Sequence, residues 1–532
     1  MAVLIVMAGC VTLFARSGRF VSSEVTPKWL GLWVLTGVAG AIFGVAAAVA
    51  GFRPLRSIVI DRRYIILIFR ILLLLLAFQG IAQYFGWLPR HGGFPVAGSF
   101  DNPAGYAVAV ALLTPFAFPE NRYCVAEKIG CIVLTVLAFA ALWLSGSRTG
   151  MIAAAVSLII YIIFTVPARL RKYVFAGGFV ALLAGGFFLY RLKAASADGR
   201  VLIWRCSLDL VAQKPLFGHG PGAFTAVYMP AQAAYFEAYP DSRFAQLAGN
   251  VLHPFNEYLL VAVEYGLAGL AVAVVLLWLL LRGVKTAFGA VQQRPFILSL
   301  VTMAVTACFS YPFKYPFTWF AVVAGLVHLF RHWLPCRDTL FHPQSPEIRA
   351  RYAGIASGIM IVILSICSLY YTGKSLYAQL QWNDIAHRAL RGDTKEALDG
   401  YEKLLPRLGN NGLFLYNYAA ELHQAGNCAG SQAVFTRCLR YYNDFDVQML
   451  MADNAQQLND LTAAKQHLKT ASAMCPSRFM PLYQLMELYR KADRMNDART
   501  IANRLLTKEI KIPSHTIDAI LNEAEKIERL KD

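Results

Sequence analysis

Polar and cationic side chains recur beside long apolar stretches of this chain, and four clusters have residue types and spacings that could carry chemistry. They occupy residues 145–150, 198–205, 215–224 and 253–264. Such groups are costly at membrane depth, so they mark candidate functional sites.

The first cluster, Ser145-Gly146-Ser147-Arg148-Thr149-Gly150, joins two apolar stretches. One interpretation is a tight glycine turn from which Arg148 reaches water. The other is that a guanidinium fixed near the lipid headgroups holds a lipid diphosphate through paired N–H donors. The residues alone leave both open.

The second cluster is Asp198-Gly199-Arg200, followed by Trp204 and Arg205. Arg200 and Trp204 stand four residues apart, so a helix would place them on one face. This pattern fits an interfacial amphipathic helix with a tryptophan anchor, or a second cation for the same diphosphate.

The third cluster, residues 215–224, reads Pro-Leu-Phe-Gly-His-Gly-Pro-Gly-Ala-Phe. Its glycines and prolines predict a turn of unusual backbone shape. We favour His219 as a hydrogen-bonding turn residue over a catalytic one. The cluster is not a phosphate loop, because the strand, lysine and hydroxyl residue of that motif are missing.

The fourth cluster begins at His253-Pro254-Phe255-Asn256-Glu257 and opens an apolar helix. The spacing of His253, Glu257 and Glu264 (i, i+4, i+11) predicts that they share a face toward the bundle interior. A neutral imidazole can take a proton from an incoming hydroxyl. For the carboxylates we favour function over a structural ion pair.

The elements that must position these clusters are membrane helices. With 57% hydrophobic and 15% charged residues among 532, the chain is too apolar for a soluble protein. Pro312 and Pro316 leave open whether the ninth and tenth spans cross fully. The first is short, with no signal-peptide pattern, and the N-terminus is not known to be complete. We predict about eleven spans, near 2–15, 29–51, 64–84, 103–118, 129–145, 149–166, 173–190, 257–281, 296–312, 317–334 and 352–372.

Basic residues gather in alternate short loops, which predicts that those loops are cytoplasmic. The N-terminus is then cytoplasmic, and the loop 191–256 and the chain beyond 372 are extracytoplasmic. The net charge of +18 therefore reports orientation and not nucleic-acid binding. The loop residues are Arg53, Arg56, Arg62, Arg63, Arg122, Lys128, Arg169, Arg171, Lys172, Arg282, Lys285, Arg294, Arg331, Arg337, Arg349 and Arg351.

The tail, residues 375–532, is water-soluble in composition and repeats at intervals of 34, 33 and 34 residues. This is the tetratricopeptide period. The predicted fold is all-α: a polytopic membrane domain at 1–372, then an extracytoplasmic solenoid of tetratricopeptide-like repeats at 375–532. The repeating positions are Ala397, Tyr401, Leu404; Ser431, Phe435, Cys438; Ala464, Leu468, Ala471; and Ala498, Ala502, Leu505.

In their order, S-G-S-R-T, R-x-x-x-W, P-L-x-G-x-G-P-G-x-F, H-P-x-N-E-Y-L and E-Y-G-L-x-G resemble the O-antigen ligase and polymerase superfamily, which includes bacterial protein O-oligosaccharyltransferases. The resemblance covers roughly residues 98–270 and includes Ser99-Phe100-Asp101-Asn102-Pro103, similar to the family's entry into a membrane helix.

The resemblance implies a glycan donor on undecaprenyl diphosphate, used at the periplasmic face of the bacterial inner membrane without metal, cofactor or nucleotide sugar. Arg148 and Arg200 match the family's diphosphate-binding arginines, and His253 matches its proposed general base. Supporting roles are expected for Glu257, Glu264, Asn256 and His219.

The acceptor remains open between lipid A core for a ligase, another lipid-linked glycan for a polymerase, and a protein hydroxyl; ligase is slightly preferred. The repeats are expected to bind an acceptor or a protein partner. A transporter is disfavoured, because the motifs gather at one face without two related halves. A membrane-tethered scaffold would make substitution of Arg148, Arg200 or His253 harmless.

Overall fold

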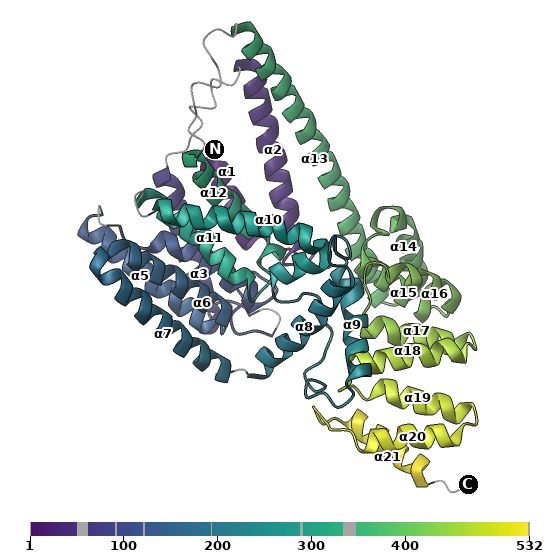
Figure 1. The fold of residues 1–532 in the computed structure, drawn as a ribbon. Coiled ribbons are helices and arrows are strands. Elements are labelled where there is room, and N and C mark those ends of the chain that lie inside the picture. The colour runs from purple at the N-terminus through teal and green to yellow at the C-terminus, as the bar shows by residue number, and fades with distance from the viewer. Residues whose placement is uncertain are drawn as a thin grey trace. The chain divides into compact units, whose positions relative to one another are not determined.

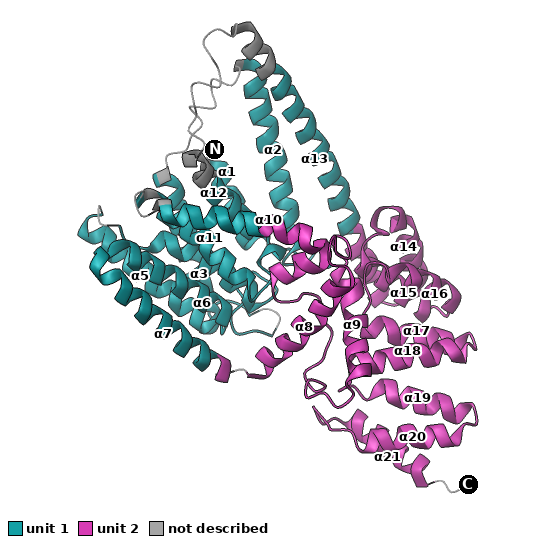
Figure 2. Ribbon diagram, in the orientation of Figure 1, with its two compact units in different colours: residues 1–189, 274–380 teal, residues 190–273, 381–532 magenta. Residues whose placement is uncertain are grey.

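The computed structural model describes residues 2–50, 62–90, 93–120, 123–192, 194–287, 291–333 and 347–529. Four basic loop residues of the orientation argument, Arg53, Arg56, Arg122 and Arg337, lie outside this part of the chain. Every regular element within it is a helix (Figure 1), which confirms the all-α class. The chain divides into two compact units (Figure 2): residues 1–189 with 274–380, and residues 190–273 with 381–532.

Seven described helices are long and apolar enough to cross a membrane, and four more are apolar but short. Each predicted span falls on one of these eleven helices. Because the four short ones need not cross, the count of eleven crossings is not confirmed. The long helices are α2 (Thr26–Ala50), α3 (Arg62–Tyr84), α5 (Val125–Leu144), α6 (Arg148–Thr165), α7 (Ala168–Leu192), α10 (Glu257–Ala287) and α13 (Glu347–Leu390); the short ones are α1 (Ala2–Phe14), α4 (Pro103–Leu113), α11 (Arg294–Ala307) and the stretch Pro316–Leu326 of α12 (Pro316–Trp333).

Helix α4 lies at the core of the first unit. Asn102 caps it by accepting a hydrogen bond from the Gly105 amide over 3.0 Å, and Pro103 occupies the first turn. All residues from Gly105 to Leu113 are buried, against α3, α5, α6, α11 and α12. A helix that is apolar on every face is stable only when protein surrounds it in this way.

Glycines let α2 and α13 approach closely. A Cβ placed on Gly44 would lie 2.7 Å from the carbonyl oxygen of Gly358, and one on Gly40 would meet the Ser365 hydroxyl. Small residues at such intervals are a common basis for helix packing in membranes, where lipid supplies no hydrophobic drive between helices.

In the second unit, the predicted outer loop packs on the helical tail. Helices α8 (Ala194–Gln213) and α9 (Phe224–Ala238) share a hydrophobic core with α17 (Phe445–Gln457) and α18 (Leu461–Met474). Buried Cys206 and Tyr228 belong to this core together with Phe445 and Met474. The compact units thus group residues differently from the predicted domains 1–372 and 375–532, and α13 continues through residues 373–374.

The tail repeats in structure as well as in sequence. Backbones with positive φ occur at Gly392, Gly426, Asn459 and Asp493, at intervals of 34, 33 and 34 residues. Each ends a helix with the same pair of hydrogen bonds, as when Gly426 and Asn427 donate to the carbonyls of His423 and Leu422. All twelve repeating positions are buried. Their assignment to the tetratricopeptide class stays a prediction. The other helices are α14 (Thr394–Leu408), α15 (Gly412–Gln424), α16 (Cys428–Cys438), α19 (Met480–Lys491), α20 (Met495–Leu506) and α21 (His515–Arg529).

Candidate functional site

Arg148 is the first residue of α6, directly after the turn that ends α5. The turn needs Gly146, whose φ is 66°, and the Ser145 hydroxyl donates to the Leu142 carbonyl over 2.7 Å. The half-buried Arg148 guanidinium donates to the Leu189 carbonyl over 3.2 Å. The Thr149 hydroxyl donates to the Phe309 carbonyl at 3.3 Å. The hairpin therefore holds Arg148 in a fixed place, next to the turn that follows α11.

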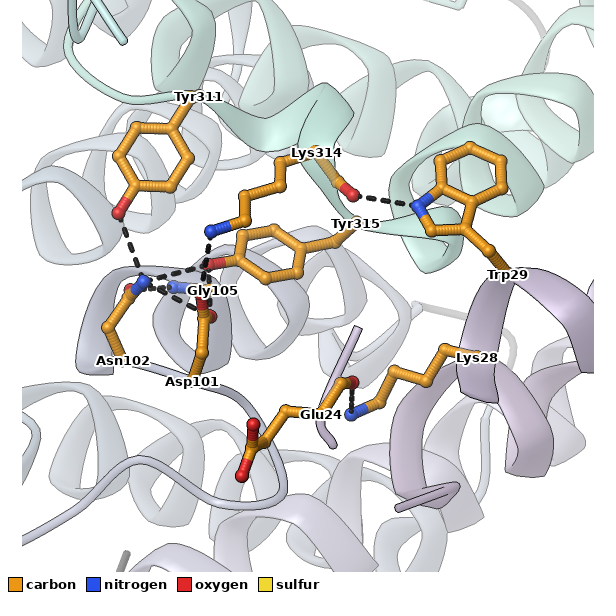
Figure 3. A network of polar contacts seen from close by, with 9 residues as sticks. All are labelled: Glu24, Lys28, Trp29, Asp101, Asn102, Gly105, Tyr311, Lys314 and Tyr315. Carbon is orange, nitrogen blue, oxygen red and sulfur yellow. Dashed lines mark hydrogen bonds and ion pairs between the residues drawn. The ribbon is translucent and has the colours of Figure 1, made fainter. Parts of the chain in front are cut away.

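That turn carries a polar network of the first unit (Figure 3). The Asp101 carboxylate accepts hydrogen bonds from Lys314 Nζ at 2.6 Å, from the Tyr315 hydroxyl at 2.7 Å and from Asn102 Nδ2 at 3.1 Å. Asn102 Nδ2 also donates to the Tyr311 hydroxyl at 3.0 Å. The sequence did not predict a role for Lys314. Locally it shows only a lysine that lies between two Tyr-Pro pairs at the end of an apolar stretch.

The same network contains a fully buried lysine at the start of α2. Lys28 Nζ donates to the carbonyls of Glu24, at 2.9 Å, and Ser99, and it lies 4.5 Å from the centroid of the Phe100 ring. The Trp29 indole donates to the Lys314 carbonyl over 3.0 Å, as Figure 3 shows. These contacts join the beginnings of α2 and α4 to the turn before α12.

In the second unit, α8 presents Arg200 and Trp204 to the segment that precedes α10. The Arg200 guanidinium lies 5.1 Å from the centroid of the Phe255 ring. One helical turn later, the Trp204 indole donates to the Pro254 carbonyl over 2.9 Å. The predicted common face of Arg200 and Trp204 is confirmed, and this face contacts the residues directly after His253.

The predicted helical alignment of His253 with Glu257 and Glu264 is wrong. Helix α10 begins at Glu257, so His253 lies in a non-helical segment. Phe255 has a φ of 54°, which is rare for a bulky residue. Asn256 then caps the helix by accepting from the Leu259 amide over 3.0 Å. His253 is half-buried, whereas Glu257 is only 7% exposed.

The glycine-rich cluster binds backbone to backbone to the first part of α10. His219 and Gly220 donate to the carbonyls of Val263 and Glu264 at 2.8 and 2.9 Å. Gly266, with φ 62° and ψ −153°, breaks α10 at this point. A Cβ on Gly218 would lie 2.4 Å from the Glu264 carbonyl carbon. The motifs around 218 and 266 therefore form one interlocked structure that only glycine permits at these positions.

Two predicted site residues have structural partners here. The His219 Nε2 atom lies 2.9 Å from the Leu210 carbonyl oxygen, as expected for a hydrogen-bonding turn residue. The Glu264 carboxylate lies close to the backbone amides of Gly222 and Phe224. It is therefore near the first turn of α9, where negative charge is favoured. Direct roles of His219 and Glu264 in chemistry stay predictions.

Each unit contains at least one pocket. A pocket of about 210 Å³ in the second unit is lined by Arg200 and Phe255. A pocket of about 290 Å³ in the first unit is lined by Glu120, Tyr161 and Arg294. The latter lies at the Thr165 end of α6, about 26 Å along the helix from Arg148. Neither this pocket nor another in the second unit, lined by Arg490 and Glu523, includes a predicted site residue, so the pocket at Arg200 is the better candidate.

The model of the O-antigen ligase family matches residues 133–274. That range is 142 of the 532 residues, and it contains all four candidate clusters but not the helical tail. No curated protein matches the chain. Together with the apolar helices, the match supports a multi-pass membrane protein whose residues 133–274 are similar to the O-antigen ligase family, with ligase- or polymerase-type function in general.

Proposed function

We propose that the chain is a glycosyltransferase that moves a glycan from undecaprenyl diphosphate to an acceptor hydroxyl at the periplasmic face of the bacterial inner membrane. One observation supports this most: the family match spans Arg148, Arg200 and His253, and Arg200 packs on Phe255, two residues from His253. The N-terminus is cytoplasmic and the helical tail periplasmic in this proposal.

The reaction is a direct displacement. The acceptor hydroxyl oxygen attacks the anomeric carbon of the donor sugar, and His253 accepts the hydroxyl proton. The bond between that carbon and the diphosphate oxygen breaks, and the diphosphate leaves with the bonding electrons. Arg148 and Arg200 are the cations that stabilise it, because guanidinium groups bind phosphate through paired donors. Attack opposite the leaving group inverts the anomeric carbon, and the step uses no metal.

The backbone around His253 supports a functional role for this segment. A left-handed phenylalanine stores strain, and such strain persists only where surrounding contacts enforce it. Those contacts here are the Arg200–Phe255 stacking, the Trp204–Pro254 hydrogen bond and the Asn256 cap. They hold the imidazole-bearing segment in one conformation, as a general base requires.

The ligase reading, with lipid A core as acceptor, is the form we propose, and polymerase and protein O-oligosaccharyltransferase are the alternatives. The motifs serve all three, since only the acceptor differs. The tail, proposed to be tetratricopeptide-like, binds the acceptor or a protein partner. Its fused hydrophobic core with α8 and α9 favours a tail that acts beside the reaction site rather than as a remote tether.

The test is deletion of the gene and its restoration as wild type, His253→Ala or His515→Ala. His515 is an exposed residue at the start of α21 and serves as the matched histidine control. Lipopolysaccharide and glycoproteins are then examined by gel and glycan stain. We expect only His253→Ala to leave the glycan on its lipid carrier, and the lost product identifies the acceptor. Full restoration by a normally inserted His253→Ala protein would refute the proposed base.

A further inference from the structure

The pocket of about 210 Å³ in the second unit is built from α8, α9 and the segment on both sides of His253. Arg200 and Phe255 form one wall, and Leu202 and Val251 add apolar surface. Two glycines, Gly199 and Gly249, also line the pocket. The pocket therefore combines a cation, an aromatic ring and an open backbone surface.

Neither glycine is required by the protein's own conformation or packing. Gly199 lies inside α8, where glycine is destabilising relative to alanine. Neither Gly199 nor Gly249 has a positive φ, and a Cβ on either would meet nothing within 4 Å. Gly218 and Gly266 differ in both respects. What the two pocket glycines do preserve is the space of the pocket.

The wall that contains Gly249 is fixed. Gln232 is fully buried, and its Nε2 atom donates to the carbonyls of Gly249 at 3.2 Å and Met474 at 2.6 Å. The Tyr228 hydroxyl donates to the Gln232 Oε1 atom over 2.8 Å. A wall held by such a network loses little freedom when a ligand binds, which favours binding.

The lining suits a sugar ring beside a phosphate. Arg200 supplies paired donors for phosphate oxygens, while the ring of Phe255 and the aliphatic side chains suit the C–H face of a sugar. The size admits one ring and not an oligosaccharide. We infer that this pocket holds the sugar attached directly to the diphosphate of the donor, with Arg200 at the phosphate. This inference rests on the proposed function and adds the position of the first sugar.

The test uses the full chain in lipid nanodiscs and three probes: farnesyl diphosphate, and farnesyl diphosphate carrying N-acetylglucosamine or galactose. Binding is measured by calorimetry. We expect wild type to bind at least one glycosylated probe about tenfold more tightly than farnesyl diphosphate. Gly199→Leu, which fills the pocket with a good helix former, is expected to abolish that difference without lowering the Tm or weakening farnesyl diphosphate binding.

Gly249→Ala gives a second test outside any helix, with a smaller loss expected. The control is Gly373→Leu in α13, where a Cβ also meets nothing within 4 Å but which does not line this pocket. If both pocket variants bind glycosylated probes as wild type does, the sugar position is wrong while the proposed function stands. Pocket variants that raise only the KM of the acceptor would likewise overturn the proposed position of the donor sugar. Wild type that binds none of the probes would overturn the proposed function itself.

Discussion

The Asn250 side-chain amide donates a hydrogen bond of 3.1 Å to the carboxylate of Asp444, the residue that caps α17. The Phe445 amide returns a hydrogen bond to Asn250 Oδ1 at 3.3 Å. Asp444 is 4% exposed and also accepts from the Tyr442 hydroxyl at 2.6 Å. The segment that carries His253 is therefore attached, three residues earlier, to the helical tail.

Asn250→Ala is expected to reduce kcat by on the order of tenfold, because catalysis is sensitive to small displacements of a positioned base. Its cost in stability should be only roughly 1 kcal/mol, the usual net value of one hydrogen bond. Donor KM should change little. The measurement is steady-state transfer kinetics beside thermal unfolding, with Asp444→Ala and the double variant completing a cycle.

The control is Asp460→Ala, which removes a comparable cap, that of α18, where Asp460 accepts from the Ala463 amide at 2.9 Å. It should lose about 1 kcal/mol of stability with transfer unchanged. Equal activity losses in Asn250→Ala and Asp460→Ala would mean that the link to the tail does not position the His253 segment.

The Asp101 network of Figure 3 leads to an asymmetric prediction for its two charged members. Asp101→Ala removes the acceptor of three donors, whereas Lys314→Met removes one donor and keeps its apolar stem. We expect Asp101→Ala to lower the free energy of unfolding by roughly 2–3 kcal/mol and Lys314→Met by about 1 kcal/mol or less. Thermal unfolding in detergent measures both losses. A larger loss for Lys314→Met than for Asp101→Ala would mean that Asp101 is not the central acceptor of the network.

The positions of the apolar helices followed from sequence because hydropathy is a local property. The common face of Arg200 and Trp204 was equally local, being one turn of a helix. The alignment of His253 failed because the left-handed Phe255 and the Asn256 cap delay the helix, and no pattern of residue types specifies such a backbone. The pairing of Asp101 with Lys314 joins residues 213 apart, and nothing near either one signals it.

The packing of α8 and α9 on the tail was missed for a similar reason. The sequence predicts residues 215–224 and 253–264 as candidate sites separate from the tail. In the structure they form one compact unit with residues 381–532. Single contacts such as that between Gln232 and Met474 span 242 residues. By contrast, the repeat interval was visible, because the same turn recurs along the tail at a fixed distance.

Lys508 gives the tail a predicted pH dependence. Burial, aided by the neighbouring Arg504, lowers the pKa of Lys508 from 10.5 to about 8. Its ammonium lies 4.7 Å from the Phe479 ring centroid and 2.5 Å from the Arg478 carbonyl oxygen. Between pH 8 and 10.5 the unfolded chain retains a proton that the folded protein has released, so stability rises with pH through this window.

The expected gain is at most about 3 kcal/mol, and Lys508→Met should remove it. Thermal unfolding from pH 7 to 10.5 measures the effect, and Lys511→Met, at an exposed neighbouring position, is the matched control that should keep the wild-type slope. A wild-type slope that survives in Lys508→Met would assign the pH dependence to other groups.

Substitutions at Gly218 and Gly222 can distinguish two effects on stability. One is the close contact between the glycine-rich cluster and α10, and the other is left-handed backbone strain. Their φ angles are 69° and 70°, so alanine suffers the same left-handed strain at both. Only at Gly218 would the new Cβ lie 2.4 Å from the Glu264 carbonyl carbon, a backbone atom that cannot rotate away; at Gly222 nothing lies within 4 Å. Gly222→Ala should therefore cost about 1 kcal/mol, and Gly218→Ala at least about twice that.

The clash in Gly218→Ala should also affect the reaction site. Its relief must move residues 263–265 and with them the short helix that begins directly after the His253 segment. We expect Gly218→Ala to lose transfer activity even at temperatures where it is fully folded, and Gly222→Ala to retain most of it. Thermal unfolding and transfer rates measured on the same preparations decide this. If the two variants lose equal stability, left-handed backbone strain alone explains the need for glycine at both positions. The contact between Gly218 and Glu264 would then not position the helix that follows the His253 segment.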